Sequence, residues 1–277
     1  MKNLTSEEKL KLQFKGFLAT PPLWKEKDLI RFPEFLMTEV IRDLKVDLKI
    51  PANLVLGRRI EYFFRYYIDE FSRHRTLAAN LQIIQEKITL GELDFLLQDK
   101  ISAEISHVEL VYKFYLYDPS ISTEMERWIG PNRRDSLVRK LDRLTRHQFP
   151  LLYRKETRET LKSLQIDPQE VSQKICFKAH LFLPYSQPDL KPTGVNAECI
   201  SGRWLHYLKF TKREFGDHLF YLPKKENWPV DPKFNKQWLD YEEIYPQLQH
   251  LLLLKHAPLI WLKTGVDSFD RIFVVWW

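Results

Sequence analysis

The stretch that decides the fold is Gly91-Glu92-Leu93-Asp94-Phe95-Leu96-Leu97, followed by His107-Val108-Glu109-Leu110-Val111-Tyr112-Lys113-Phe114-Tyr115-Leu116. Both segments are rich in β-branched, aromatic and aliphatic residues that alternate with polar ones, which predicts two strands. Successive side chains of a strand point to opposite faces of the sheet. If the two strands pair, Asp94, Glu109 and Lys113 converge on one face. Two carboxylates and an ammonium at one place suit a hard divalent cation beside a phosphate.

A helix and a further strand precede this pair. Gly57–Phe71 carries apolar residues at helical spacing, and Leu81–Ile88 alternates as a strand before a three-residue turn. Glu61 lies at the edge of the buried stripe of the helix, where a carboxylate is unfavourable unless it is paired or coordinates a ligand. Either Glu61 helps to bind a metal ion, or it forms a surface salt bridge with Arg58 or Arg65.

This order of acids and elements resembles the PD-(D/E)XK nuclease superfamily, and more closely a bacterial family of uncharacterised proteins grouped with it. In that pattern Glu61 matches the helix acid, Asp94 the acid of the first core strand, and Glu109 the acid of the next strand. The resemblance covers roughly residues 55 to 150. It implies an α/β fold with a restriction-endonuclease-like core of a helix, a three-stranded mixed sheet and a second helix. It also implies that Asp94, Glu109 and Glu61 hold Mg²⁺ or Mn²⁺.

The sequence departs from the superfamily pattern at two positions. Val111 occupies the usual lysine position two residues after Glu109, and the nearest lysine on the same face is Lys113, about 7 Å further along the strand. A long, flexible lysine side chain can lean back over that distance. The residue before Asp94 is Leu93 instead of proline, and that proline has no chemical role.

Each residue of the predicted site has a structural alternative. Asp94 and Glu109 either bind a cation or belong to a buried network of acids and a lysine. Lys113 either stabilises charge on a phosphate oxygen or forms an ion pair with Glu109. His107 lies on the same face, either as a ligand contact or as a residue of the rim.

The most basic part of the chain is a predicted helix over Asp135–Gln148, with Leu137, Leu141 and Leu144 as its buried stripe. Together with a net charge of +6 and a pI of about 9.1, this segment favours contact with a polyanion. The alternative is an exposed cationic helix in which the final Gln is an ordinary terminal residue. The predicted nucleic-acid contacts are Arg133, Arg134, Arg139, Lys140, Arg143 and Gln148.

We expect three regions: an N-terminal helical brace over residues 1–50, a nuclease-like core over 51–165, and a β-rich, mainly antiparallel lobe over 166–277. The brace is predicted to contain a second helix from Phe35 to Leu44. The predicted elements of the lobe are strands over Lys174–Pro184, Gly202–Phe210, His218–Leu222, Leu259–Lys263 and Arg271–Trp277, and a helix over Gln237–Leu254.

Composition and motifs exclude several other classes. With 44% hydrophobic and 29% charged residues, the chain is typical of a folded globular protein. Its apolar runs are too short for a membrane span and it shows no secretion signal, so we expect a cytoplasmic location. Cys176 and Cys199 show no metal-binding spacing and imply no disulfide. Ser201 and His206 have no supporting acid motif, and the sequence contains no phosphate-binding Gly-rich loop, zinc spacing or dinucleotide fingerprint.

The function that these features favour is magnesium-dependent hydrolysis of phosphodiester bonds in DNA, or less favourably RNA. Two alternatives stay open. One is a nuclease-fold module that binds nucleic acid without cutting it, with Val111 marking the loss of catalysis. The other is a structural or protein-interaction role, in which the acids form salt bridges. The sequence does not specify the oligomeric state.

Overall fold

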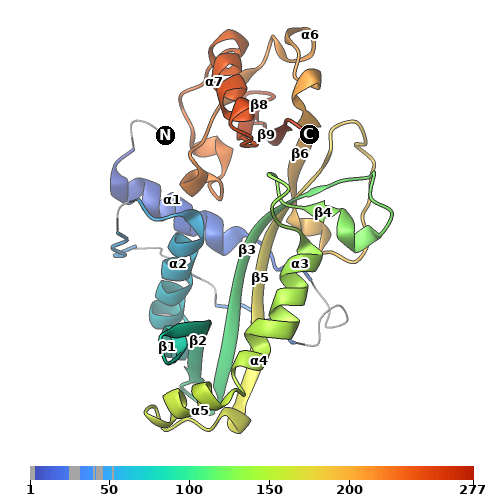
Figure 1. Cartoon of the computed structure of the whole chain (residues 1–277). Coiled ribbons are helices and arrows are strands. Elements are labelled where there is room, and N and C mark those ends of the chain that lie inside the picture. The colour runs from blue at the N-terminus through green and yellow to red at the C-terminus, as the bar shows by residue number, and fades with distance from the viewer. Residues whose placement is uncertain (1–3, 25–31, 40, 42–45, 52) are drawn as a thin grey trace.

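A computed structural model describes residues 4–24, 32–39, 41, 46–51 and 53–277 (Figure 1). The strands are β1 His74–Gln85, β2 Ile88–Asp99, β3 Ile105–Tyr117, β4 Trp128–Ile129, β5 Val171–Pro184, β6 Ile200–His206, β7 Leu219–Tyr221, β8 Leu259–Lys263 and β9 Phe269–Val275. The α-helices are α1 Ser6–Ala19, α2 Leu56–Phe71, α3 Leu137–Arg143, α4 Phe149–Leu151, α5 Lys155–Lys162, α6 Lys212–Phe215 and α7 Tyr241–Leu253. One π-helical turn spans Leu144–Gln148, and 3-10 turns span Glu124–Arg127, Pro168–Glu170, Ala197–Cys199, Tyr207–Lys209, Lys225–Asn227 and Pro232–Phe234.

The described strands form one mixed sheet in the order β1-β2-β3-β5-β6-β9-β8-β7, and the short β4 pairs with β3. The mixed α/β class is therefore confirmed, but the sheet has nine strands instead of three. β1, β2 and β3 are joined in antiparallel fashion, whereas the three-stranded core was predicted to be a mixed sheet. The β1–β2 turn is formed by Glu86 and Lys87, before the predicted position, so that residues 89–91 lie inside β2.

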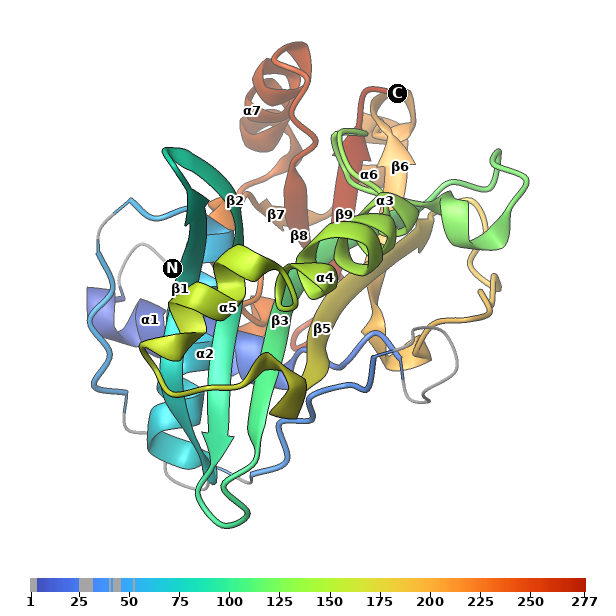
Figure 2. The same cartoon turned by 60° about the horizontal axis from the view of Figure 1, so that its bottom comes forward.

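The two faces of the sheet are covered by different helices. Phe95, Val108 and Phe114 pack with α1 and α2, whereas Val111 and Tyr115 pack with α3 and the π-helical turn. The predicted alternation along β3 is therefore confirmed, and it places Glu109 and Lys113 on the α3 side. Figure 2 shows α3, α4 and α5 in front of the sheet. On β2 the alternation is broken. Leu93 packs with Leu96 and with Leu161 of α5, instead of with Phe95 and Leu97.

The N-terminal region contains less helix than predicted. α1 is present and begins with a capping box between Thr5 and Glu8. The helix predicted over residues 35–44 is wrong for the described residues 35–39 and 41, which form no helix; residues 40 and 42–44 lie outside the described part. This segment is not helical because its backbone bonds to a strand: the Phe35 amide donates to the Ile175 carbonyl of β5 at 2.6 Å.

The predicted C-terminal strands and the helix α7 are present, but their pairing differs from the prediction. β3 pairs with β5, β5 with β6 and β6 with β9 in parallel, and antiparallel pairing among the described strands of the predicted lobe is limited to β7–β8 and β8–β9. The predicted boundary between residues 165 and 166 therefore falls between two hydrogen-bonded strands of one sheet. Within the described ranges, no helix combines the length and the apolar character needed to cross a membrane.

Candidate functional site

The candidate site lies where β2 and β3 separate. Their ladder ends at the pair Phe95–Val108. At the next position the Asp94 carboxylate, instead of a backbone carbonyl, accepts from the Leu110 amide at 2.9 Å. A side-chain bond to the backbone of this kind satisfies the amide while ending the strand pairing. Asp94 and Glu109 are thereby placed beside each other at the opening between the strands.

Glu109 is fully buried and both of its carboxylate oxygens are engaged. Oε1 lies 2.9 Å from Nε2 of His107, which is also fully buried. Oε2 accepts a hydrogen bond from the Nε2 amide of Gln148. A buried carboxylate needs such partners. A carboxylate has about four lone-pair positions, so these contacts leave further positions for a ligand.

Gln148 connects Glu109 to Lys140. Its Oε1 atom accepts from the Lys140 ammonium at 2.7 Å. Gln148 ends the π-helical turn, and the Phe149 amide after it donates to the Leu144 carbonyl. π-Helical turns are rare in proteins, and those that occur are often found at functional sites. The structure thus brings Gln148 and Lys140, both predicted as nucleic-acid contacts, to the same site as Glu109.

Electrostatics tie Lys140 to the two acids. Burial raises the pKa of Asp94 well above its usual value, and the charge of Glu109 raises it further; the Leu110 amide and Lys140 act in the opposite direction. Burial lowers the pKa of Lys140, against the influence of Glu109 and Asp94. Two neighbouring carboxylates with one partly buried ammonium favour an added positive charge, either a proton or a cation.

Lys113, in contrast, does not contact the two acids. Its ammonium lies 2.5 Å from Oδ2 of Asp135, just before α3. The alternative ion pair with Glu109 is also not formed, because Glu109 is bonded to His107 and Gln148. Lys140, which the sequence indicated only as a nucleic-acid contact, occupies the place beside the acids that was expected for Lys113.

Glu61 belongs to a network at the rim. Its Oε2 atom accepts from Arg58 at 2.7 Å and from the side-chain amide of Asn80 at 2.8 Å. Arg58 and Asn80 also bond Glu92, at 3.4 and 3.0 Å. The alternative salt bridge with Arg58 is therefore formed. Glu61 still lies near the site, since its charge contributes to raising the pKa of Asp94.

The predicted nucleic-acid contacts divide into three groups. Arg133 is held by other side chains: its guanidinium lies 4.5 Å from the ring centroid of Trp277 and 3.3 Å from Asp118. Lys140 and Gln148 point to the acids. The remaining three are exposed and form no ion pair with the residues that the structure describes: Arg134, Arg139 and Arg143.

The sequence analysis did not predict three features of the site: the place of Lys140, the π-helical turn and the bond between Asn80 and Glu61. Lys140 is three residues after Leu137 and four before Leu144, so it borders the buried stripe of the helix. This spacing indicates that its side chain can point toward the site. The π-helical turn precedes Pro150, which has no amide to continue the α-helical bonds, so proline was also a signal. The bond from Asn80 to Glu61 could not be predicted from the sequence, because Asn80 adopts a left-handed φ of 52° within β1, which strand alternation does not anticipate.

The donor set fits a hard divalent cation only in part. No group of three or more His, Cys, Asp or Glu side chains is arranged as a metal site in the portion of the chain that the structure covers. Asp94 and Glu109 nevertheless supply two carboxylates, which are the ligands that Mg²⁺ and Mn²⁺ prefer. Mg²⁺ commonly uses one or two carboxylates and completes its shell with water and phosphate oxygens.

No curated protein and no solved structure matches this chain. A family model described as Domain of unknown function (DUF1853) matches residues 35–275. The matched span includes the site residues Glu61, Asp94, Glu109, Lys140 and Gln148 and every strand of the sheet. Because the match covers well over half of the chain, the protein belongs to the DUF1853 family.

Proposed function

We propose that the protein is a metal-dependent phosphodiesterase that hydrolyses DNA, built on a restriction-endonuclease-like core formed by α2, β1 to β3 and α3. One observation carries this proposal: Asp94 and Glu109 lie side by side where β2 and β3 separate, opposite Lys140 and Gln148. This arrangement combines acidic oxygen donors with a cation that can face a phosphate.

In this proposal Asp94 and Glu109 would hold Mg²⁺ or Mn²⁺, with Glu61 as a third acid near them. A bound cation lowers the pKa of a coordinated water and neutralises charge on the scissile phosphate. Hydrolysis would form a bond from a water oxygen to phosphorus and break the bond to the leaving sugar oxygen, which would take up a proton in place of the one that the water loses. The raised pKa of Asp94 supports the proposal, because a cation relieves the repulsion between the two acids.

The other residues orient the acids and the phosphate. His107 and Gln148 hold the Glu109 carboxylate by one oxygen each. Lys140 takes the role expected for Lys113, stabilising charge on the phosphate, because its ammonium already lies beside the acids. Lys113 holds Asp135 at the start of α3 and so positions that helix.

The exposed arginines Arg134, Arg139 and Arg143 give the α3 side a row of charges for the DNA backbone. Such contacts set register and salt dependence, not sequence preference. The two acids and Lys140 would then act on the phosphate that these arginines place beside them.

The test is cleavage of linear, circular and single-stranded DNA, with and without Mg²⁺ or Mn²⁺. We expect metal-dependent cutting that is lost in Asp94→Asn and Glu109→Gln but kept in Glu104→Gln, an exposed acid in the β2–β3 turn. Cutting that survives in both site variants would indicate a contaminating nuclease. If the protein cuts no substrate and metal does not raise its thermal stability, the catalytic site is refuted.

A second candidate is a nucleic-acid-binding module without catalysis. It is favoured by the engagement of both Glu109 oxygens and by Val111 at the usual lysine position. Salt-dependent DNA binding without cleavage in any metal would support this function over the first.

A further inference from the structure

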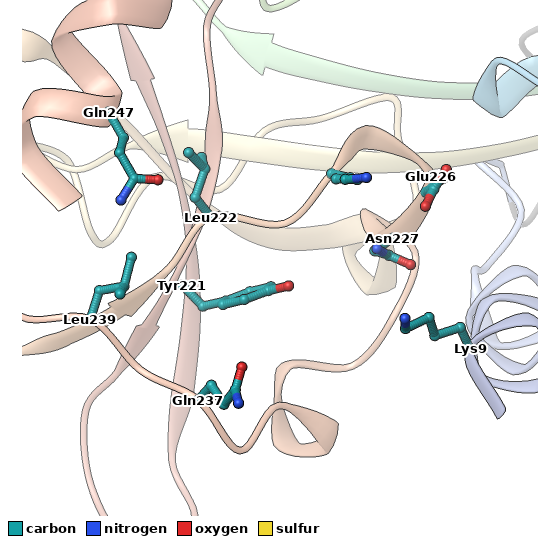
Figure 3. A pocket seen from close by; sticks show the side chains of 9 residues that line it. Lys9, Tyr221, Leu222, Glu226, Asn227, Gln237, Leu239 and Gln247 are labelled. Carbon is teal, nitrogen blue, oxygen red and sulfur yellow. The ribbon is translucent and has the colours of Figure 1, made fainter. Parts of the chain in front are cut away.

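A cavity of about 500 Å³ lies between α1, β7 and α7, away from the acidic site. In Figure 3 the ring of Tyr221 extends across this space toward Asn227, and Lys9 of α1 enters from the opposite side. The volume is within the range of small-molecule sites. The lining residues are Lys9, Tyr221, Leu222, Lys224, Glu226, Asn227, Gln237, Leu239 and Gln247.

One wall of the cavity is fixed by a buried network. Gln13 of α1 is almost fully buried; its amide donates to Oδ1 of Asn227 at 2.7 Å, and its Oε1 atom accepts from Arg59 of α2 at 2.5 Å. The charge of Glu226 acts on Arg59. The network therefore joins α1, α2 and the turn Lys225–Asn227, so this side of the cavity is formed before a ligand arrives.

The lining combines a flat apolar surface with polar ends. Tyr221 packs against the buried Trp261 at a ring-centroid distance of 5.2 Å, which holds its ring in place. Leu222 and Leu239 extend the apolar surface. An aromatic face suits a planar ring, and the amides of Asn227 and Gln247 suit the donors and acceptors at the edge of a base.

The charges at the cavity favour an anionic group. Neither Lys9 nor Lys224 forms an ion pair with any residue that the structure describes. Glu226 is the only acid of the lining, and it lies near Arg59. The two ammonium groups therefore remain to bind a phosphate.

The turn Lys225–Asn227 borders both this cavity and β3. Its last residue, Asn227, lines the cavity, whereas the ammonium of Lys225 lies 5.3 Å from the ring centroid of Trp228. Trp228 packs on Phe114 of β3 at 5.1 Å, next to Lys113 in sequence. Lys113 and Lys225 are close enough for the charge of Lys113 to add to the effect of burial in lowering the pKa of Lys225. The turn thus places a second cation, Lys225, near Lys113.

We propose that this cavity binds one unpaired nucleotide, with its base against Tyr221 and its phosphate at Lys9 and Lys224. The inference rests on the proposed function in one respect: it takes the nucleotide to be part of the strand whose backbone passes Lys225 and Lys113 to the acids. A base held in this way favours single-stranded or frayed substrates over intact duplex.

The test is isothermal titration of the full chain, without divalent metal, using deoxynucleoside 5′-monophosphates and inorganic phosphate. We expect the nucleotides to bind at least about tenfold more tightly than phosphate, because an aromatic face adds stacking. Tyr221→Ala and Lys224→Glu should each weaken nucleotide binding about tenfold. Gln247→Ala tests the amide that faces the edge of the base. Gln249→Ala is its matched control, because both residues are exposed on α7 but only Gln247 lines the cavity.

Two results would overturn the cavity site: nucleotides that bind no more tightly than phosphate, or a folded Lys224→Glu variant that binds them as well as the wild type. Lys224 is exposed, so its exchange tests binding even if Tyr221→Ala unfolds the chain. Nucleotide binding that persists in Asp94→Asn supports the cavity independently of catalysis. DNA cleavage without nucleotide binding refutes the cavity alone, and nucleotide binding without cleavage refutes the nuclease alone.

Discussion

Gln148 and Glu109 lie 39 residues apart in the sequence, and the amide of Gln148 donates to the buried carboxylate of Glu109. The same carboxamide accepts from Lys140. One side chain of the π-helical turn therefore sets the position of both an acid and a cation, because its two ends have opposite hydrogen-bonding roles. Only a carboxamide can perform both roles at this length.

We expect Gln148→Glu and Gln148→Leu each to lower metal-dependent cleavage by about 10–100-fold, the effect typical of residues that orient a metal ligand. Gln148→Glu places a third acid beside Glu109, and Gln148→Leu removes the partner of the Lys140 ammonium and of Oε2 of Glu109, whose Oε1 stays bonded to His107. The measurement is initial cleavage rate as a function of Mn²⁺ concentration. A positioning role predicts a higher metal requirement in Gln148→Leu, which disturbs the Glu109 carboxylate without adding an acid.

Thr145→Ala is the matched control, because Thr145 is exposed on the same helical segment and, among the residues that the structure describes, its hydroxyl bonds only to the Leu141 carbonyl. A Gln148→Leu variant with wild-type rate and metal requirement would show that the bond to Glu109 has no role in the reaction.

The two lysines near the site are expected to differ. Lys140→Met should reduce cleavage by about 100-fold or more, the loss typical when a charge-stabilising group is removed. Lys113→Met should reduce it less, because Lys113 bonds to Asp135 instead of the acids. Single-turnover cleavage at saturating DNA separates this effect from weaker binding.

The pH profile gives a second measurement for this pair. Burial lowers the pKa of Lys140, so the rate that depends on its charged form should decline at a lower pH than an ordinary lysine would give. A larger loss in Lys113→Met than in Lys140→Met would assign the phosphate-facing role to Lys113 and contradict the present assignment.

The strands around the site could be predicted from sequence because their side chains alternate. β3 and β8 match the predictions closely, and Glu109 lies on the expected face. Lys113 was assigned to that face correctly, but strand periodicity does not show where a flexible ammonium ends. Its position depends on Asp135, which the chain brings near only through the turn before α3.

The extent of the sheet could not be predicted, because it depends on pairing between distant segments. β5 joins β3 in parallel along residues 105–116 and 171–182, and a local pattern does not distinguish that pairing from an antiparallel lobe. The N-terminal segment shows the same limit. Residues around Phe35 have helical spacing, but their backbone bonds to β5, so tertiary pairing overrides local propensity.

Glu34 gives a pH-dependent stability that is independent of the site. Burial raises the pKa of Glu34 to about 8, although the Phe177 amide and the charge of Lys178 act in the opposite direction. Its Oε2 atom is buried and has no hydrogen-bond partner among the described residues. An acid whose pKa is raised by folding binds more protons in the folded state, so stability falls as the pH rises from about 4.5 to about 8.

We expect Glu34→Gln to remove this dependence. At pH 9 its Tm should exceed that of the wild type by at least about 2–4 °C, the shift that ~1 kcal/mol gives in a chain of this size. At pH 5 the two should melt alike. Glu104→Gln, an exposed exchange, is the control. Equal melting temperatures of Glu34→Gln and wild type across this range would show that Glu34 is not buried in its charged form.

Asp94 links stability to metal binding. Burial and the charge of Glu109 raise its pKa well above the usual value, so the charged form destabilises the fold at neutral pH. Asp94→Asn removes that charge and keeps an oxygen to accept from the Leu110 amide. At pH 7 without metal we therefore expect this variant to melt about 2–4 °C above the wild type. The difference should shrink as the pH falls and Asp94 of the wild type becomes protonated.

Adding Mn²⁺ should reverse the order. A cation that binds only the folded state stabilises the wild type in proportion to the logarithm of its concentration, whereas Asp94→Asn lacks one of the two carboxylates and should respond little. Differential scanning fluorimetry over a series of Mn²⁺ concentrations measures both effects. A metal response equal in the two proteins would place the cation elsewhere. A variant less stable than the wild type without metal would show that Asp94 is held by compensating charges, so the acids form a structural network instead of a metal site.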